Sequence, residues 1–545
     1  MLTEIKKFPW KKTLLCAALS SSVLLAGCKV TIKGDEETED LISDAVDGIV
    51  IKDKTGSGSG TACDAITTTS GYAFPCDAVY VAPDAVDGDD ITEALMLALF
   101  EIPDDSIVVL PEGEFVVSET ITIAGTNGLT LTGYGIHATK LDFTGSTGDD
   151  GIRFEGGTDI TTRDLGVYET NKNGIKIVGA NGVYLTYTAT VWEGDIADSQ
   201  GAYGLYPLQS QNILMENNYS YGSADAGIYV GQSNNIVVRD NTANYNVAGI
   251  EIENSTNADV YNNLATNNAA GILSFDLPGL QQAYGGNVRI FSNEIYANNT
   301  PNVGNGAVGI APSGTGVLVF ATSDVEVYNN NISENRTTAI ALSSYFMADP
   351  DVANYATNYG ATIADGWSPM IKNVYMHNNT ISRNGDDPQG PLLTDVIAGY
   401  GSPYNSTGMP QVFPAILYDG IGELLSNAGA LAGFNAIVSS DAAADGVNYN
   451  PYGAGDVICA NNNINANPAP SYDDVNTGLV YGTDPTTPGI FDANGNPQPF
   501  LLIDQMVNNT FLNCTQDRLA PAVVTFKGKD YGCTADDLAE PACSL

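Results

Sequence analysis

Short runs of alternating apolar and polar residues, each followed by a polar turn, recur along most of the chain. One stretch reads NIVVRDN over 235–241, continues through a few polar residues and then reads AGIEI over 248–252. Successive strand side chains point to opposite faces, so each run predicts one short strand with one apolar face. A different pattern, DITEALMLALF over 90–100, has helical spacing and an acidic start, and predicts one short helix ahead of the strands.

An asparagine recurs at the end of the first strand of each pair. The first steps are 23 and 22 residues, which suits one coil of three short strands, and later steps of 30 and 37 predict loops inserted between strands. Stacked coils would bury their Ile and Val side chains together and let each asparagine amide bond to the coils above and below. We therefore expect an all-β parallel β-helix, a solenoid, with a structural ladder formed by Asn218, Asn241, Asn263, Asn293, Asn330, Asn379, Asn462 and Asn509.

The N-terminus has the order of a secretory signal. Four lysines precede a short apolar run over 13–25, and the sequence Leu-Ala-Gly-Cys ends at Cys28. These four residues resemble the lipobox of bacterial lipoproteins, which implies cleavage before Cys28 and lipid attachment to its sulfur. Lys29 takes the place of the aspartate that retains such proteins at the inner membrane, so the resemblance implies an outer-membrane lipid anchor in the cell envelope.

The rest of the chain divides by composition. Residues 1–27 are the expected signal peptide, 28–60 an acidic tether ending in GSGSG, and 61–545 one β-helix domain. Within that domain we expect an N-terminal cap over 61–105, regular coils over about 106–345, and loop-rich coils with a C-terminal cap over 346–545. The tail after Cys514 is expected to cover the open edge of the last coil.

Charge and cysteine content narrow the partners. The net charge is −43, and loss of residues 1–27, with four lysines and one glutamate, would make it −46. Such a surface makes nucleic acid a poor partner.

Six cysteines beyond Cys28 predict disulfides; fifteen pairings are possible, and the most local set is Cys63–Cys76, Cys459–Cys514 and Cys533–Cys543. Alternating oxygen side chains over 492–496 offer a weak Ca²⁺ signal, but an Asn/Gly turn explains them better, so no metal or other cofactor is expected.

Candidate ligand-binding residues follow from the strands that begin Gly-Ile. If the isoleucine points inward, the next residue points outward, and successive coils present one external file. That file and its neighbours give the candidate set Arg153, Lys176, Tyr203, Tyr206, Tyr229, Glu251, Glu253, Phe275 and Asp276. Tyrosine rings flanked by charges suit a linear polysaccharide; an ordinary solvated sheet in which tyrosine is a good strand former is the alternative.

The case for catalysis is weaker. YGLYPL over 203–208 resembles the Tyr-Gly-x-Asp-Pro-His motif of β-helix alginate epimerases, but Tyr206 replaces the aspartate and Leu208 the histidine. Paired carboxylates for glycoside hydrolysis could come from Asp225, Glu251, Glu253 and Asp276. Both histidines, His137 and His377, are expected at the surface.

Two further resemblances concern the whole architecture. The helix followed by VVLPEGEF resembles the opening of pectin-lyase-like proteins, which implies a right-handed β-helix whose first coil the helix caps. The strands YGLYPLQS, AGIYVGQS, AGIEIENS and AGILSFDLPGL, together with the lipobox, resemble a bacterial family of parallel β-helix repeat lipoproteins over roughly 79–345.

That family has no assigned activity, and its members are often encoded beside a diheme c-type cytochrome-like protein. The resemblance therefore implies an envelope c-type cytochrome as a partner. Three hypotheses remain: a carbohydrate-binding or scaffold protein, a polysaccharide lyase, epimerase or hydrolase, and an accessory to an envelope redox protein.

Overall fold

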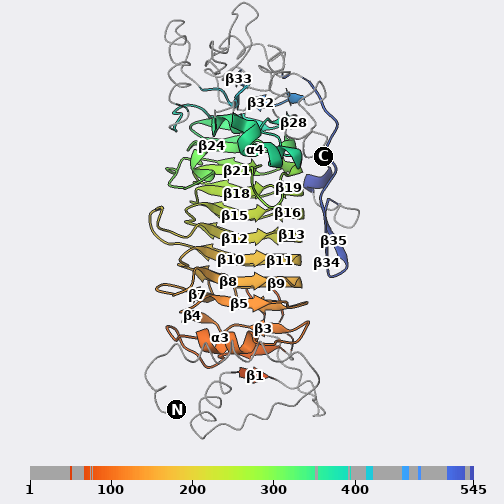
Figure 1. Cartoon of the computed structure of the whole chain (residues 1–545). Helices are drawn as coiled ribbons and strands as arrows, with labels where there is room; N and C mark the ends of the chain where they lie inside the picture. The colour runs from red at the N-terminus through yellow and green to blue at the C-terminus, as the bar shows by residue number, and fades with distance from the viewer. Residues whose placement is uncertain are drawn as a thin grey trace, which may run out of the picture. The chain divides into compact units, whose positions relative to one another are not determined.

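Short parallel strands stack into coils whose three walls enclose one apolar column (Figure 1). The computed structural model describes residues 49–51, 67–73, 75, 78–349, 354–390, 393, 413–420, 457–465, 477–479, 512, 514–533 and 541–544. All of them belong to one unit, Gly48–Leu545. The expected signal peptide, Cys28, most of the tether and the pair Cys63–Cys76 lie outside these residues. The parallel coils confirm the all-β solenoid.

The first wall is an eleven-stranded parallel sheet. Its strands, in chain order, are β5 (Ile121–Ala124), β8 (Asp150–Glu155), β10 (Asn173–Val178), β12 (Tyr203–Leu208), β15 (Ala226–Gly231), β18 (Ala248–Glu253), β21 (Ala270–Phe275), β24 (Thr315–Phe320), β27 (Thr338–Ser343), β30 (Ile416–Tyr418) and β33 (Thr477–Leu479).

The second and third walls belong to one larger sheet, which turns a corner between them. The second wall contains β2 (Val79–Val81), β3 (Ile107–Val109), β6 (Thr130–Thr132), β9 (Thr158–Tyr168), β11 (Asn181–Val191), β13 (Gln211–Glu216), β16 (Asn234–Arg239), β19 (Thr256–Tyr261), β22 (Gly286–Phe291), β25 (Ser323–Tyr328), β28 (Lys372–His377) and β31 (Ile458–Asn461). The third wall contains β4 (Gly113–Val116), β7 (Thr139–Asp142), β14 (Tyr219–Tyr221), β17 (Thr242–Asn244), β20 (Leu264–Thr266), β23 (Glu294–Tyr296), β26 (Asn331–Ser333), β29 (Thr380–Ser382) and β32 (Ile464–Asn465). Strands β9 and β11 run through both walls.

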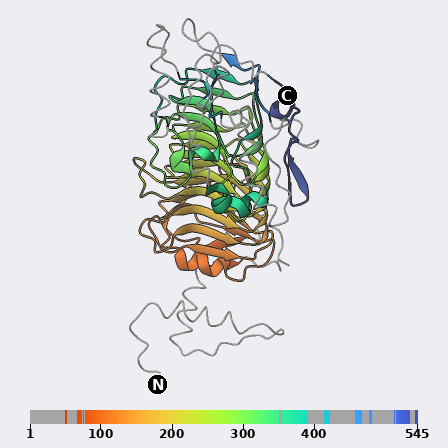
Figure 2. The ribbon, with the colours of Figure 1, turned by 45° about the horizontal axis from the view of Figure 1, so that its top comes forward.

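The remaining elements are short. Strand β1 (Ile49–Ile51) pairs antiparallel with β2, and the 3₁₀ turns are η1 (Val308–Ile310), η2 (Tyr345–Met347) and η6 (Pro541–Ser544). Helix α3 (Thr92–Leu99) lies at the N-terminal end of the column, with Leu95 and Leu99 in the core, as expected of a cap (Figures 1 and 2). Helix α4 (Tyr355–Ala364) belongs to the segment between β27 and β28. Among the described residues no helix has the length and apolar character needed to cross a membrane.

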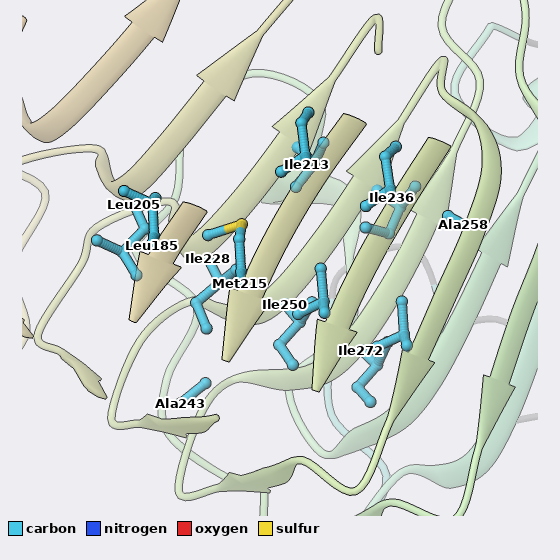
Figure 3. Packing of buried hydrophobic residues seen from close by; sticks show 14 of the residues in the cluster. Leu185, Leu205, Ile213, Met215, Ile228, Ile236, Ala243, Ile250, Ala258 and Ile272 are labelled. Atoms are coloured by element: carbon cyan, nitrogen blue, oxygen red, sulfur yellow. The ribbon is translucent and has the colours of Figure 1, made fainter. Parts of the chain in front are cut away.

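The column is filled by the inward-pointing side chains of the strands. Leu205, Ile228, Ile250 and Ile272 are in register on neighbouring strands of the first wall, and all are completely buried. Figure 3 shows them meeting the inward residues of the second and third walls. Each fully buried aliphatic side chain contributes about 1.5–3 kcal/mol, so the stack of coils supplies a core that no single coil could form.

The asparagine ladder occupies the corner between the second and third walls. In each coil the buried amide donates to the amide oxygen of the next asparagine and to a backbone carbonyl: Asn241 Nδ2 lies 3.0 Å from Asn263 Oδ1 and 2.9 Å from the Met215 carbonyl oxygen. The ladder contains Asn218, Asn241, Asn263, Asn293, Asn330 and Asn379, as expected. It continues to Asn463, so the choice of Asn462 was wrong by one residue, and Asn509 lies outside the described residues.

A second asparagine ladder, which the sequence pattern had not suggested to us, occupies the corner between the third and first walls. Its amides repeat the same contacts, with Asn268 Nδ2 2.9 Å from Asn298 Oδ1. The members are Asn246, Asn268, Asn298, Asn335 and Asn384. Buried polar groups are normally hydrogen-bonded, and these side chains satisfy both one another and the turn backbone.

The C-terminal segment runs back along the outer face of the second wall. Its hairpin, β34 (Val523–Phe526) with β35 (Lys529–Gly532), lies beside β11 and β13 in Figure 1. The Lys527 ammonium donates to the Gly128 carbonyl oxygen at 3.3 Å, while Gln516 donates to the Val457 carbonyl oxygen at 2.7 Å. Residues 514–533 therefore lie along the side of the column, not over its last coil as expected.

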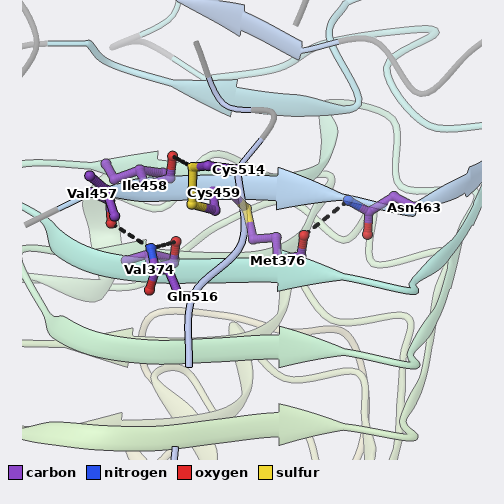
Figure 4. Close-up of a disulfide and its surroundings, with 8 residues drawn as sticks. All are labelled: Val374, Met376, Val457, Ile458, Cys459, Asn463, Cys514 and Gln516. Atoms are coloured by element: carbon purple, nitrogen blue, oxygen red, sulfur yellow. Dashed lines mark hydrogen bonds between the residues drawn. A yellow bond between two sulfur atoms is a disulfide. The ribbon is translucent and has the colours of Figure 1, made fainter. Parts of the chain in front are cut away.

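Two disulfides hold this segment. Cys459–Cys514 ties it to β31, as Figure 4 shows, and Cys533–Cys543 closes a short loop after the hairpin. Two of the three predicted pairings are therefore present, and the third, Cys63–Cys76, lies outside the described residues.

Candidate functional site

The outer face of the first wall carries the predicted file of side chains in register. Arg153, Lys176 and Tyr206 occupy equivalent positions on β8, β10 and β12 and are partly exposed. Tyr229 and Glu251 continue the file on β15 and β18, but each is only 3% exposed. Side chains alternate between the inner and outer faces as predicted. The expectation that the whole file is exposed was wrong for its second half.

Long loops cover that second half. Leu277, Val303 and Ile310, from the segments before β22 and before β24, pack against a cluster that includes Tyr229 and Phe275 on the outer face. The strand pattern fixes which side of the sheet a residue occupies, but an inserted loop decides whether water reaches it.

Two more candidates lie beneath these loops and support them. Phe275 is completely buried, with its ring centroid 5.4 Å from that of Phe320. Asp276 is 3% exposed; its Oδ1 accepts from the Gly285 backbone at 2.9 Å and its carbonyl oxygen from the Trp367 indole at 3.1 Å. Phe275 and Asp276 therefore hold the loops in place in this structure, and neither is open to a ligand.

Three tyrosines pack together where the accessible half of the face meets the covered half. The ring centroids of Tyr203 and Tyr206 are 4.5 Å apart, and Tyr229 lies 4.7 Å from Tyr203 and 4.9 Å from Tyr206. The Tyr229 hydroxyl donates to Glu253. Glycine at position 231 leaves room for this hydrogen bond, because a Cβ there would collide with the Tyr229 hydroxyl. Tyr203 and Tyr206 are partly exposed, so they are the two rings of the group that a ligand can reach.

Three carboxyl groups adjoin these tyrosines. Asp225 immediately precedes β15, and Glu251 and Glu253 lie two residues apart on β18. Burial raises the pKa of Asp225 to about 8; a hydrogen bond with Tyr203 opposes the shift and repulsion from Glu253 adds to it. Burial also raises the pKa of Glu251, well above its usual range, and that of Glu253. Burial of this group therefore favours the protonated form of Asp225 up to higher pH than for an exposed aspartate.

Two oxygens of this group have no hydrogen-bond partner among the described residues, Asp225 Oδ1 and Glu251 Oε2. Buried polar atoms without partners are rare in folded proteins, and such atoms commonly bind a ligand or an ordered water molecule. Asp225 was named from the sequence only as one of many acids for hydrolysis, and nothing in the pattern could have shown that a tyrosine group surrounds it.

Basic side chains border the tyrosines on the N-terminal side. The Lys176 ammonium lies 4.9 Å from the centroid of the Tyr206 ring, a cation–π contact, and burial lowers the pKa of Lys176. Arg153 pairs with Asp150 at 3.2 Å and with Glu155 at 2.8 Å. The accessible half of the face thus combines two rings, an ammonium and a guanidinium.

The second wall carries buried polar groups of a different kind. His377 is 4% exposed beneath the C-terminal segment, so its expected surface position was wrong. Its ring stacks on Tyr328 at 5.2 Å and its Nε2 lies 2.9 Å from Glu326 Oε1. Arg518 of the tail pairs with the same glutamate. These contacts hold the tail on the wall and leave no room for a ligand.

The described residues include no group of three or more His, Cys, Asp or Glu side chains arranged to hold a metal ion. Two of the acids beside the tyrosines form hydrogen bonds with tyrosine side chains, Asp225 with Tyr203 and Glu253 with Tyr229.

Comparison with known proteins agrees with this architecture. The family model described as "Right handed beta helix region" matches residues 119–277. These residues form a right-handed β-helix. A search of curated proteins found no match.

Several solved structures resemble this β-helix. The A-module of mannuronan C-5 epimerase AlgE4 from Azotobacter vinelandii is 15% identical, with a TM-score of 0.38, over 61% of this chain and 89% of that one. The catalytic unit of a GH87 α-1,3-glucanase from Streptomyces thermodiastaticus is 15% identical, with a TM-score of 0.36, over 67% of this chain and 52% of that one. At this identity the likeness concerns the fold alone.

Proposed function

We propose that this chain is an envelope-anchored β-helix protein that binds a carbohydrate chain on the outer face of its first wall. The observation that carries the proposal is the pair of partly exposed rings, Tyr203 and Tyr206, whose centroids are 4.5 Å apart and which the Lys176 ammonium borders. Tyrosine rings combine an apolar surface with a polar end, which suits the apolar face and hydroxyl rim of a sugar.

The flanking groups define how such a chain would lie. Arg153, Lys176 and Tyr206 follow one another across three strands, so a linear ligand along this file would cross β8, β10 and β12. Beyond Tyr206 the face is covered by loops, and the bound segment would end there. Asp225 would act indirectly, by holding Tyr203 through their hydrogen bond, and the Lys176 ammonium would donate to the hydroxyl oxygens of a sugar unit.

A glycan array followed by calorimetric titration tests the proposal. With the best glycan, Tyr206→Ala should weaken binding about tenfold, because one stacked ring contributes about 1–1.5 kcal/mol. Tyr296→Ala is the matched control, since Tyr296 is a 38% exposed tyrosine on the third wall. Glu251→Gln should change binding little, because Glu251 is covered. Equal loss in Tyr206→Ala and Tyr296→Ala, or no glycan bound at all, would remove the first wall from consideration.

A second candidate function is hydrolysis of the bound polysaccharide. It is favoured by one observation, that the carboxyl groups of Asp225 and Glu253 adjoin the same tyrosine group; burial raises the pKa of both, and glycoside hydrolysis uses a carboxyl group of raised pKa as its acid beside a second carboxyl group. A reducing-end assay on the bound glycan separates the two functions. Product that disappears in Asp225→Asn supports hydrolysis, and absence of product with retained binding supports a binding protein.

Envelope anchoring and the redox partner are proposals that rest on the resemblances of the N-terminus and the coils. Labelling with a radioactive fatty acid should mark the wild type and not Cys28→Ala. Co-purification of a c-type cytochrome from envelope extracts, abolished by competition with the purified chain, would support the accessory role.

A further inference from the structure

A groove on the third wall, away from the face just described, has the side chains of a second ligand site. Its lining includes Tyr221, Asn244, Tyr245, Asn267, Thr300 and Arg336. Its volume is about 500 Å³, within the range of small-ligand pockets, and it is broadly open to solvent. We propose that this groove binds an oligosaccharide that carries a carboxylate, with the sugar rings against Tyr221 and Tyr245 and the carboxylate at Arg336.

The tyrosines at one end of the groove are aligned. The ring centroids of Tyr221 and Tyr245 are 5.4 Å apart with planes inclined by 22°, and Tyr219 continues the series 6.4 Å from Tyr221 at 15°. All three are partly exposed. Tyr219 and Tyr221 lie on β14 and Tyr245 follows β17 in the next coil, so the stacked rings form one aromatic end of the groove that apolar sugar atoms can contact.

Amide side chains form the floor. Asn267 Nδ2 donates to Asn244 Oδ1 at 3.1 Å, which fixes both amides and leaves Asn244 Nδ2 and Asn267 Oδ1 for other partners. Thr300 donates to the Asn267 carbonyl oxygen and so holds the opposite side of the groove. A fixed donor beside a fixed acceptor suits the hydroxyl groups of a sugar, which both donate and accept.

Arg336 supplies the positive charge. Its backbone is fixed at both ends: the N–H donates to Asn299 Oδ1 at 2.9 Å and the carbonyl oxygen accepts from the Asp387 N–H at 3.0 Å. Its guanidinium is exposed and forms no ion pair or hydrogen bond with any described residue. Nearby Glu334 is neutralised by Arg383. In a chain of net charge −43, a free guanidinium in a polar groove is unusual, and it matches the planar geometry of a carboxylate.

The charge balance also limits the ligand. Burial raises the pKa of Tyr221, and the nearby groups Tyr245, Tyr219, Asp195 and Glu193 add to the shift. Acids near this end disfavour a second carboxylate there, so the ligand of the groove carries its carboxylate at the Arg336 end.

Calorimetric titration of the whole chain with two tetrasaccharides tests this assignment. The acidic probe alternates glucuronate with N-acetylglucosamine, and the neutral probe contains N-acetylglucosamine alone. The acidic probe should bind about tenfold more tightly, because its carboxylate can form a charged, two-point hydrogen-bonded pair with the Arg336 guanidinium and the neutral probe cannot. Arg336→Gln should remove that difference, and the double variant Tyr221→Ala/Tyr245→Ala should weaken both probes.

Two variants serve as controls. Lys172→Gln removes one positive charge from an exposed lysine elsewhere and should leave binding unchanged. Tyr206→Ala should also leave it unchanged, because the groove does not depend on the function proposed for the first wall. If the tyrosine double variant does not fold, Asn267→Ala replaces it. The assignment is overturned if the acidic probe does not bind, if both probes bind equally, if Arg336→Gln binds like the wild type, or if Tyr206→Ala abolishes binding.

Discussion

Replacement of Asn330 by alanine should cost far more stability than replacement of its neighbour Asn331. Asn330 is 1% exposed and belongs to the ladder between the second and third walls. Its Nδ2 donates to the Ile290 carbonyl oxygen and to Asn379 Oδ1, each at 2.9 Å. Its Oδ1 accepts from the backbone and side-chain nitrogens of Asn293 at 3.0 and 2.9 Å.

The magnitude follows from the groups that would lose a partner. Asn330→Ala leaves the Ile290 carbonyl, the Asn293 backbone N–H and one Asn293 amide hydrogen unpaired inside the column. A buried unsatisfied group costs about 1–3 kcal/mol, so the loss from these three groups should be about 3–9 kcal/mol. Asn331 is exposed and makes one side-chain hydrogen bond, 2.7 Å to Glu294, so Asn331→Ala should cost under about 1 kcal/mol.

Urea unfolding followed by circular dichroism measures both losses, and hydrogen exchange at the Asn293 amide locates them. That amide should exchange much faster in Asn330→Ala and normally in Asn331→Ala. The reasoning would be refuted by equal losses of stability in the two variants, or by unchanged protection at Asn293.

Three further predictions concern the buried charges and the tail. Folding raises the pKa of Asp225 from 3.8 to about 8, so the folded chain binds more protons than the unfolded chain between these pH values. The free energy of unfolding should therefore fall as pH rises from about 4 to 8. Urea midpoints of Asp225→Asn should fall less over this range, and a pH dependence equal to that of the wild type would contradict the prediction. The Cys459–Cys514 bond closes a loop of 55 residues, so the variant with both cysteines changed to alanine should lose about 4 kcal/mol by the loop-entropy relation, measured by urea unfolding against the wild type. Arg289 pairs with buried Asp259 at 2.7 Å, so Arg289→Met should lower the free energy of unfolding by about 3–5 kcal/mol in thermal and urea melts. The double variant Arg289→Met/Asp259→Leu should recover most of that stability. A double variant as unstable as the single one would rule out the unpaired charge as the cause.

The sequence predicted the coils and the first asparagine ladder because both depend on local spacing. The residue before each ladder position has positive φ, as at Asn262, Asn329 and Asn378, a conformation that asparagine tolerates well. Most of these corners therefore contain two consecutive asparagines, with Asp240 and Ser292 as the exceptions, and the run of three at 461–463 explains the error of one residue.

The second ladder also has a regular spacing in the sequence. Asn246, Asn268 and Asn298 each follow a member of the first ladder by five residues, and the later coils repeat this offset. Five residues is the length of one short third-wall strand with its turns, so a search at this offset would have found the second corner.

The cover over the first wall could not be predicted in the same way. The burial of Tyr229 and Glu251 depends on where loops from other coils fold, and the residues of those loops show no period. His377 is buried for the same reason, because a tail segment about 140 residues further along the chain lies over it. Local spacing thus gives the side of a wall, and tertiary packing decides exposure.

The C-terminal segment changes how such a stack can come apart. In a simple solenoid each coil contacts only its neighbours, so the ends can fray one coil at a time. Here the covalently attached C-terminal segment joins the coil of Gly128 to that of Val457. Separating two coils anywhere between them must also detach this segment from the wall. The chain should therefore lose its middle coils in one concerted event, which gives an elongated repeat protein the all-or-none behaviour of a small globular domain.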